Sequence, residues 1–95
     1  MVKYPVRVPI PRRQLPGKPS ANFVREWGEK IQDYINERAK NYSTIPLSYE
    51  QIARDTHIRK EIVEAFLRPL GGGYIGITIH NPQLENHREA YRKPS

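Results

Sequence analysis

The first long run of periodic apolar residues covers residues 20–40. Its apolar side chains recur at spacings of three and four, which places them on one face of a helix: Phe23, Val24, Trp27, Ile31, Tyr34 and Ile35. Charged residues fall largely on the opposite face. Ser20 or Asn22 can cap the start, and Asn41 is a candidate stop. We therefore expect a helix from Ser20 to about Lys40, with Trp27 as a core anchor.

Two shorter helices are predicted next. Ser48 followed three residues later by Gln51 matches a capping box, which starts a helix that ends at about residue 54 or 55. The break falls on residues 55–57, and the second helix covers about 59–67 and ends before a proline. The two apolar faces consist of Ile52 and Ala53 in the first helix, and of Ile58, Ile62, Val63, Phe66 and Leu67 in the second.

Short extended segments surround these helices. Residues 45–47 (Ile-Pro-Leu) are interrupted by proline, so they form at best an edge strand. The glycines at 71–73 permit a tight reversal with positive φ. The β-branched and aromatic residues of segment 74–79 favour a strand. Asn81-Pro82 can cap a last helix over residues 83–93.

The first twenty residues have a different composition, with five prolines and one glycine. Proline removes backbone donors and fixes φ, so no helix or central strand is expected there. Residues 4–10 alternate in a way that permits a short edge strand. Two interpretations remain open: a disordered or polyproline-like tail, and a basic arm that lies on a polyanion. They are compatible, because an arm can stay disordered until it binds.

Charge distinguishes the same segment. The chain carries a net charge of +6, and residues 1–20 hold five bases and no acid: Lys3, Arg7, Arg12, Arg13 and Lys18. Bases and acids balance through residues 21–68, with eight of each. The length allows one domain, and the absence of cysteine excludes disulfides and thiolate metal sites. With no membrane-spanning run and no signal-peptide pattern, we expect a cytoplasmic protein, associated with the nucleoid if bacterial.

Residues 48–68 resemble a helix-turn-helix. Ile52 and Ala53 match the apolar residue and the small alanine of the motif's first helix. Ile58 matches the apolar residue after the turn, Val63 the β-branched core position of the second helix, and Phe66 the apolar position near its end. With the following strand, region 20–80 is similar to a winged-helix domain.

The chain departs from that pattern at three points. His57 stands where the motif usually has glycine, although histidine tolerates positive φ better than most residues. Thr56 stands where an apolar residue is common. A full wing needs two strands after the second helix, but only segment 74–79 qualifies. Its partner can be segment 45–47, which leaves a minimal wing at the glycines 71–73.

The resemblance implies that the second helix enters the major groove of DNA. Its outward positions are then Arg59, Lys60, Glu61, Glu64, Ala65 and Arg68. Arg59 and Lys60 near the helix start can reach guanine or phosphate, and Arg68 is placed for a phosphate. Glu64, like Glu61, can accept a hydrogen bond from cytosine N4 but repels phosphate.

The start of the first short helix is expected near the DNA backbone. The candidates are the free N–H groups of Tyr49 and Glu50, the Ser48 hydroxyl and the Gln51 side chain. Arg54 can contact a phosphate or pair with Glu50 one turn earlier. If all five arm bases also meet phosphates, the log–log dependence of binding on salt has a slope of about −4 to −5.

Other classes fit less of the sequence. A protein-interaction module is favoured by the two glutamates on the expected reading face and by the proline-rich arm, which can dock in an aromatic groove. RNA binding is permitted by the arm, but no aromatic strand platform supports it. The glycine run lacks the lysine and helix of a phosphate cradle. The scattered His57, His80 and His87 suggest neither catalysis nor a metal site, and no cofactor is expected.

The sequence thus predicts a mostly α domain with a small β element, of helix-turn-helix and winged-helix-like type, with an extended arm. The expected division is a basic arm over 1–19, the domain over 20–80 and a tail or short helix over 81–95. The expected function is binding to double-stranded DNA, as a small transcriptional regulator or accessory factor. A homodimer is plausible, because one such motif covers little DNA.

Overall fold

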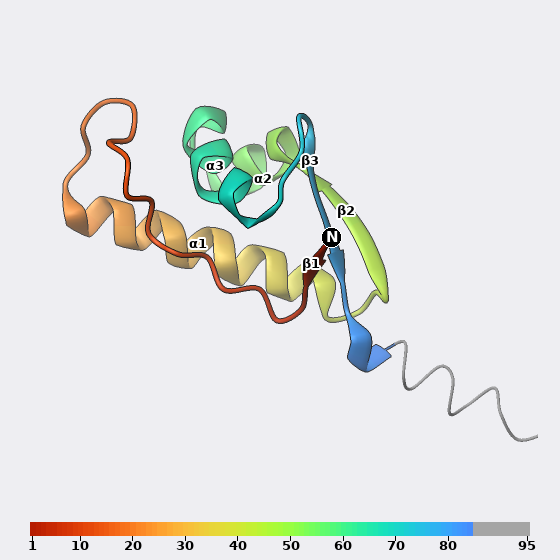
Figure 1. Cartoon of the computed structure of the whole chain (residues 1–95). Helices are drawn as coiled ribbons and strands as arrows, with labels where there is room; N and C mark the ends of the chain where they lie inside the picture. Colours follow the sequence, from red (N-terminus) through yellow and green to blue (C-terminus); the bar gives the residue numbers. More distant parts are fainter. Residues whose placement is uncertain (85–95) are drawn as a thin grey trace, which may run out of the picture.

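The structure, a computed structural model, describes residues 1–84. The elements follow the chain in the order β1 (Val2–Lys3), α1 (Ala21–Ala39), β2 (Thr44–Ser48), α2 (Tyr49–Thr56), α3 (Lys60–Leu67), the 3-10 helix η1 (Arg68–Leu70) and β3 (Gly76–His80). The long α1 spans the molecule, and the shorter helices and the sheet lie on one side of it (Figure 1). The described part is a small α/β domain, which confirms the prediction of a helical domain with a small β element at that level.

The buried face of α1 is centred further along the helix than the apolar pattern predicts. Its buried residues are Gly28, Ile31, Ile35 and Ala39. Gly28 lies where the helix meets the ring of Phe66, because a Cβ at Gly28 would be 3.2 Å from Phe66 Cε1. Phe23 was expected on the core face but is 54% exposed and stacks on Trp27, with ring centroids 5.9 Å apart. The first turn of α1 therefore extends past the edge of the core.

The sheet has the order β1-β3-β2, with β3 in the centre. β2 and β3 are antiparallel, with Leu47 opposite Ile77 and Ile45 opposite Ile79. The prediction that segment 45–47 pairs with the later strand is confirmed. Pro46 is tolerated because β2 is an edge strand and its missing N–H leaves no ladder partner unsatisfied on a further strand. β1 lies on the other side of β3 and runs parallel to it, with Val2 opposite Ile79.

The N-terminal segment packs against α1 as part of the domain. The Tyr4 N–H donates to the His80 carbonyl at 2.8 Å. The Asn36 side chain binds both backbone groups of Val6, accepting from its N–H at 2.7 Å and donating to its carbonyl at 2.9 Å. Val6 and Leu15 are only 2% and 4% exposed. The interpretation as a disordered tail is therefore wrong for this segment, because Val6 and Leu15 belong to the core and the backbone of residues 2–8 has partners in β3 and α1.

The core lies between α1, the α2–α3 pair and the sheet. Its largest fully buried side chains include Tyr49, Phe66, Ile52 and Ile79. Within the described part of the chain, β3 alone follows α3 as a strand. Residues 68–75 form η1 and a turn in which Gly71 has φ 103°, so the two-stranded wing of a full winged helix is not present there. β1 from the N-terminus occupies the second edge of β3 instead.

Only the start of the helix predicted over residues 83–93 lies within the described part of the chain. Asn81 is buried, and its side-chain oxygen accepts from the Gln83 N–H at 3.1 Å at the start of a helical turn over residues 82–84. The rest of the predicted helix, including His87, lies outside the described residues. Across residues 1–84, none of the helices combines the length and the apolar character needed to cross a membrane.

Candidate nucleic-acid interface

A three-residue turn, residues 57–59, joins α2 to α3, two residues later than the predicted break at 55–57. α2 continues through Thr56, and His57 caps it in the left-handed conformation with φ 59°. The N–H groups of His57 and Ile58 both donate to the Ala53 carbonyl, which closes the helix end. Thr56 is 7% exposed, and its hydroxyl donates to the Ile52 carbonyl at 2.6 Å. This bond explains how a threonine occupies a position where an apolar residue is common, since the only polar atom of the buried side chain has a hydrogen-bond partner.

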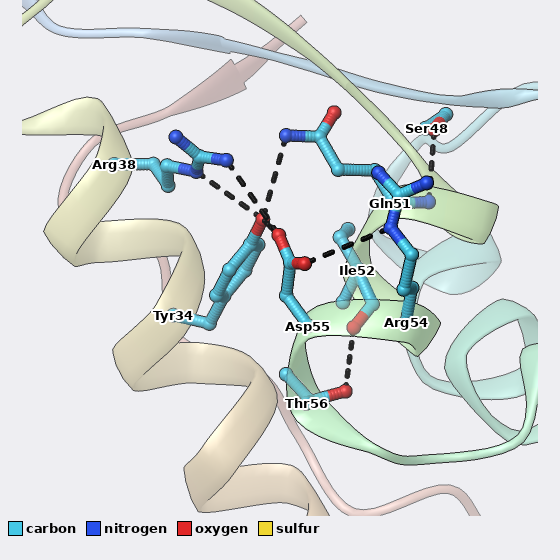
Figure 2. A network of polar contacts seen from close by, with 8 residues as sticks. All are labelled: Tyr34, Arg38, Ser48, Gln51, Ile52, Arg54, Asp55 and Thr56. Atoms are coloured by element: carbon cyan, nitrogen blue, oxygen red, sulfur yellow. Dashed lines mark hydrogen bonds and ion pairs between the residues drawn. The ribbon is translucent and has the colours of Figure 1, made fainter.

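A polar network ties α2 to α1 on the outer side of this pair (Figure 2). The Tyr34 hydroxyl donates to Asp55 Oδ2 at 2.5 Å. The Tyr34 hydroxyl oxygen also accepts hydrogen bonds from Arg38 Nε at 3.2 Å and from Gln51 Nε2 at 3.4 Å. The hydrogen bond and the electrostatic interaction with Tyr34 raise the pKa of Arg38, and the charge of Asp55 adds a smaller effect in the same direction. The network holds α2 at a set position on α1, and with it the start of α3.

The residues expected to meet a DNA backbone at the start of α2 are largely engaged inside the protein. Tyr49 contradicts the prediction of a free N–H, because its N–H donates to the Ile75 carbonyl at 2.9 Å. Its side chain is fully buried and donates to the Gly73 carbonyl at 2.8 Å. The Ser48 hydroxyl accepts from the Gln51 N–H at 3.0 Å, which confirms the predicted cap. The Gln51 side chain points to Tyr34 instead of returning to Ser48.

The other two candidate residues of α2, one in its first turn and one in its last, remain on the surface. Glu50 is exposed, and Arg54 is also exposed. Arg54 Nε lies 3.8 Å from Asp55 Oδ1, so its partner is Asp55 and not the predicted Glu50. The side chain of Arg54 is 75% exposed, so this pair is solvent-screened and Arg54 can exchange Asp55 for another anion.

The outward face of α3 is nearly neutral. Arg59 Nε lies 3.3 Å from Glu61 Oε2, and Arg68 Nη2 lies 3.7 Å from Glu64 Oε2. Arg68 also sits over the ring of Tyr74, 5.9 Å from its centroid. Lys60 is the one base of this face without an ion pair to another residue in 1–84. The two glutamates that weaken the DNA interpretation on sequence grounds are thus each matched by an arginine.

The five bases of the N-terminal segment have the opposite character. Each is exposed, and none forms an ion pair with any residue that the structure describes: Lys3, Arg7, Arg12, Arg13 and Lys18. Between residues 21 and 84, eight bases and eight acids cancel. The net charge of the described residues therefore lies entirely on this segment, as the sequence predicts.

Part of the segment lies beside α3. The two enclose a groove of about 710 Å³. The N-terminal segment contributes residues 9–16, and α3 and η1 contribute Glu61, Glu64, Ala65, Phe66, Arg68 and Pro69. Arg12 and Arg13 are thereby brought next to the expected reading helix. Sequence reasoning missed this groove, because the contact joins residues about fifty positions apart and Leu15 is its only local signal.

Comparison with family models, with curated proteins and with solved structures gives no match for this chain.

Proposed function

We propose that the protein binds double-stranded DNA, using the N-terminal bases for phosphate contacts and the start of α3 for the groove. The observation that supports this most is the separation of charge: residues 21–84 are neutral, whereas the N-terminal segment carries five exposed bases without ion pairs to residues 1–84. Unpaired surface arginines and lysines are the groups that displace counterions from a phosphate backbone. The α2–α3 pair, with its left-handed turn and its resemblance to a helix-turn-helix, supplies an element that fits the major groove.

The ion pairs on α3 indicate which element contacts the bases and which contacts the phosphates. Arg59 and Lys60 are exposed at the start of α3, where a helix-turn-helix reaches base edges. Because Arg59 is paired with Glu61 and Arg68 with Glu64, α3 contributes little net attraction for phosphate. The N-terminal segment supplies that attraction, and Arg12 and Arg13 supply it closest to α3. A role as a small transcriptional regulator or accessory DNA factor is consistent with this arrangement.

The test must leave the fold intact, so it uses charge substitutions instead of deletion of the segment. We expect Arg12→Ala/Arg13→Ala to lower affinity for a random duplex and to reduce the salt slope of log affinity by about 2, since each lost phosphate contact removes about 0.9. The control is Lys30→Ala/Lys40→Ala, which removes the same number of exposed bases from α1 and its cap, where Lys40 pairs with Glu37. Titrations at several salt concentrations, followed by fluorescence anisotropy, measure both slopes.

Two results would contradict the proposal. Equal changes in the two double variants would show that only total charge matters, with no interface. Absence of binding by the wild-type protein at low salt would exclude duplex DNA as a nonspecific ligand. A further variant, Lys60→Ala, separates groove contact from backbone contact: we expect it to weaken discrimination between duplex sequences more than it lowers the salt slope.

A further inference from the structure

The groove between the N-terminal segment and α3 contains apolar side chains for which DNA binding has no role. In Figure 1 the orange part of the N-terminal segment loops above the start of α1, on the side of α1 where α3 lies. Its deepest lining residues are Leu15 and Phe66, 4% and 1% exposed. Ile10 lines the groove wall with 58% of its surface exposed, so it presents an apolar surface to a ligand in the groove.

The charges around the groove are not balanced. The charges of Arg68 and Glu64 in the groove lining cancel, because these two residues form an ion pair. The charge of Glu61 is balanced by Arg59, which lies just outside the lining. Arg12 and Arg13 have no ion pair within residues 1–84 and are exposed on the rim. The groove therefore combines an apolar floor with two uncompensated positive charges at its edge.

This anatomy is that of a protein interface with an apolar centre and a charged rim. A small-molecule site needs polar groups that converge inside the pocket to orient the ligand, and no polar residue of the groove lining is buried. Duplex DNA would use Arg12 and Arg13 but would leave the apolar floor unfilled. The wall also cannot extend a sheet with an incoming strand, because Pro9, Pro11 and Pro16 have no N–H to donate.

We infer that this groove binds an acidic peptide segment of a partner protein, which places one large apolar side chain between Ile10 and Ala65 and carboxylates on Arg12 and Arg13. The occupant is held by its side chains and not by strand pairing. Since the peptide and DNA both need Arg12 and Arg13, the two ligands exclude each other. The inference does not depend on DNA binding, because the apolar floor and the charged rim exist without it.

The probe is a set of short fluorescein-labelled peptides in which one leucine or phenylalanine is flanked by glutamates. Control peptides carry lysine in place of each glutamate. We expect the acidic set to bind and the lysine set not to bind, with backbone amide shifts in the NMR spectrum confined to residues 10–15 and 61–68. Arg12→Glu/Arg13→Glu should weaken binding by about tenfold or more. Lys3→Glu/Lys18→Glu, which changes two bases outside the groove by the same charge, should retain it.

A second variant tests the apolar centre. Ala65→Gln keeps α3 helical, because glutamine is a good helix former, but it places a polar side chain on the groove wall. We expect it to weaken peptide binding and to leave the far-ultraviolet circular dichroism spectrum unchanged. The inference is overturned if no acidic peptide binds at millimolar protein, if lysine peptides bind equally, or if the shifted amides lie elsewhere. Duplex binding without peptide binding would overturn this inference and leave the proposed function standing. Peptide binding without duplex binding would overturn the proposed function and support this inference.

Discussion

Leu15 offers the sharpest test that the N-terminal segment belongs to the folded domain. Its side chain is 4% exposed although it lies in a stretch of prolines and bases. Burying a leucine side chain contributes about 1.5–3 kcal/mol, and a leucine-to-alanine change in a closed core costs about 2–5 kcal/mol because a cavity adds to the loss. Leu15 borders an open groove, so water can fill part of the space. We therefore expect Leu15→Ala to lower the free energy of unfolding by about 2 kcal/mol.

That loss is large for a domain of this size. Small domains are stable by about 5–15 kcal/mol in total, and each kcal/mol lowers Tm by about 4–8 °C at this length. Urea unfolding followed by circular dichroism measures the change directly. The control is Ile10→Ala in the same segment, where 58% of the side chain is already exposed and the expected change is within about 0.5 kcal/mol. Equal stabilities of the two variants would refute the packing of the segment against the core.

The same reasoning applies to removal of the whole segment. A chain that starts after Lys18 loses Val6 and Leu15 from the core and leaves Asn36 without its two backbone partners. Loss of DNA or peptide binding by such a truncated chain would therefore report unfolding as readily as loss of a contact. For this reason both binding experiments rely on side-chain substitutions instead of deletion of the segment.

Two further predictions concern the α2–α3 pair. His57→Gly should raise the free energy of unfolding by about 1 kcal/mol, because His57 holds φ 59° at a left-handed cap and glycine has no steric cost there; an unchanged or lower value in urea unfolding would contradict this. Burial raises the pKa of Tyr49, outweighing the opposite effect of nearby Arg68. The folded protein therefore favours the neutral phenol, so this stabilisation is complete below the ordinary tyrosine pKa of about 10 and is lost as pH rises through the folded value. We expect Tyr49→Phe to lower stability near neutral pH by about 1 kcal/mol, through loss of the bond to the Gly73 carbonyl. Above pH of about 10 it should show a shallower decline than the wild-type protein, and parallel declines would contradict the assignment.

Local patterns predicted the helices and several of their ends. Ser48 was recognised as a cap because a hydroxyl three residues before a glutamine serves the free N–H groups of a helix start, and it caps α2 through the Gln51 N–H. The break between the two short helices was predicted at residues 55–57, and the structure places it two residues later, at 57–59. The pairing of segment 45–47 with the later strand was also predicted. The caps and the break depend on residues within a few positions of one another, whereas the strand pairing joins two short apolar segments that lie about thirty positions apart.

The candidate site was predicted less well, and the reason differs from residue to residue. Tyr49 looked available because helix starts have free N–H groups, but the loop after η1 returns to place the Ile75 carbonyl on it. Arg59 and Arg68 were expected to face a ligand, and the structure adds Glu61 and Glu64 as their partners. The sequence already contained these charges, but which of them meet depends on side-chain positions that periodicity does not determine.

The sequence by itself determined the order of helices, the caps, the short strands and the concentration of positive charge in the first twenty residues, because these follow from local spacing and composition. Only the tertiary structure decided that the same twenty residues join the core, that β1 pairs with β3, and that Arg12 and Arg13 lie beside α3. Prolines exclude regular structure in a segment, but they do not prevent its apolar side chains from packing. Whether Val6 and Leu15 are buried depends on the surfaces that α1 and α3 present, and those surfaces exist only after the distant parts of the chain have come together.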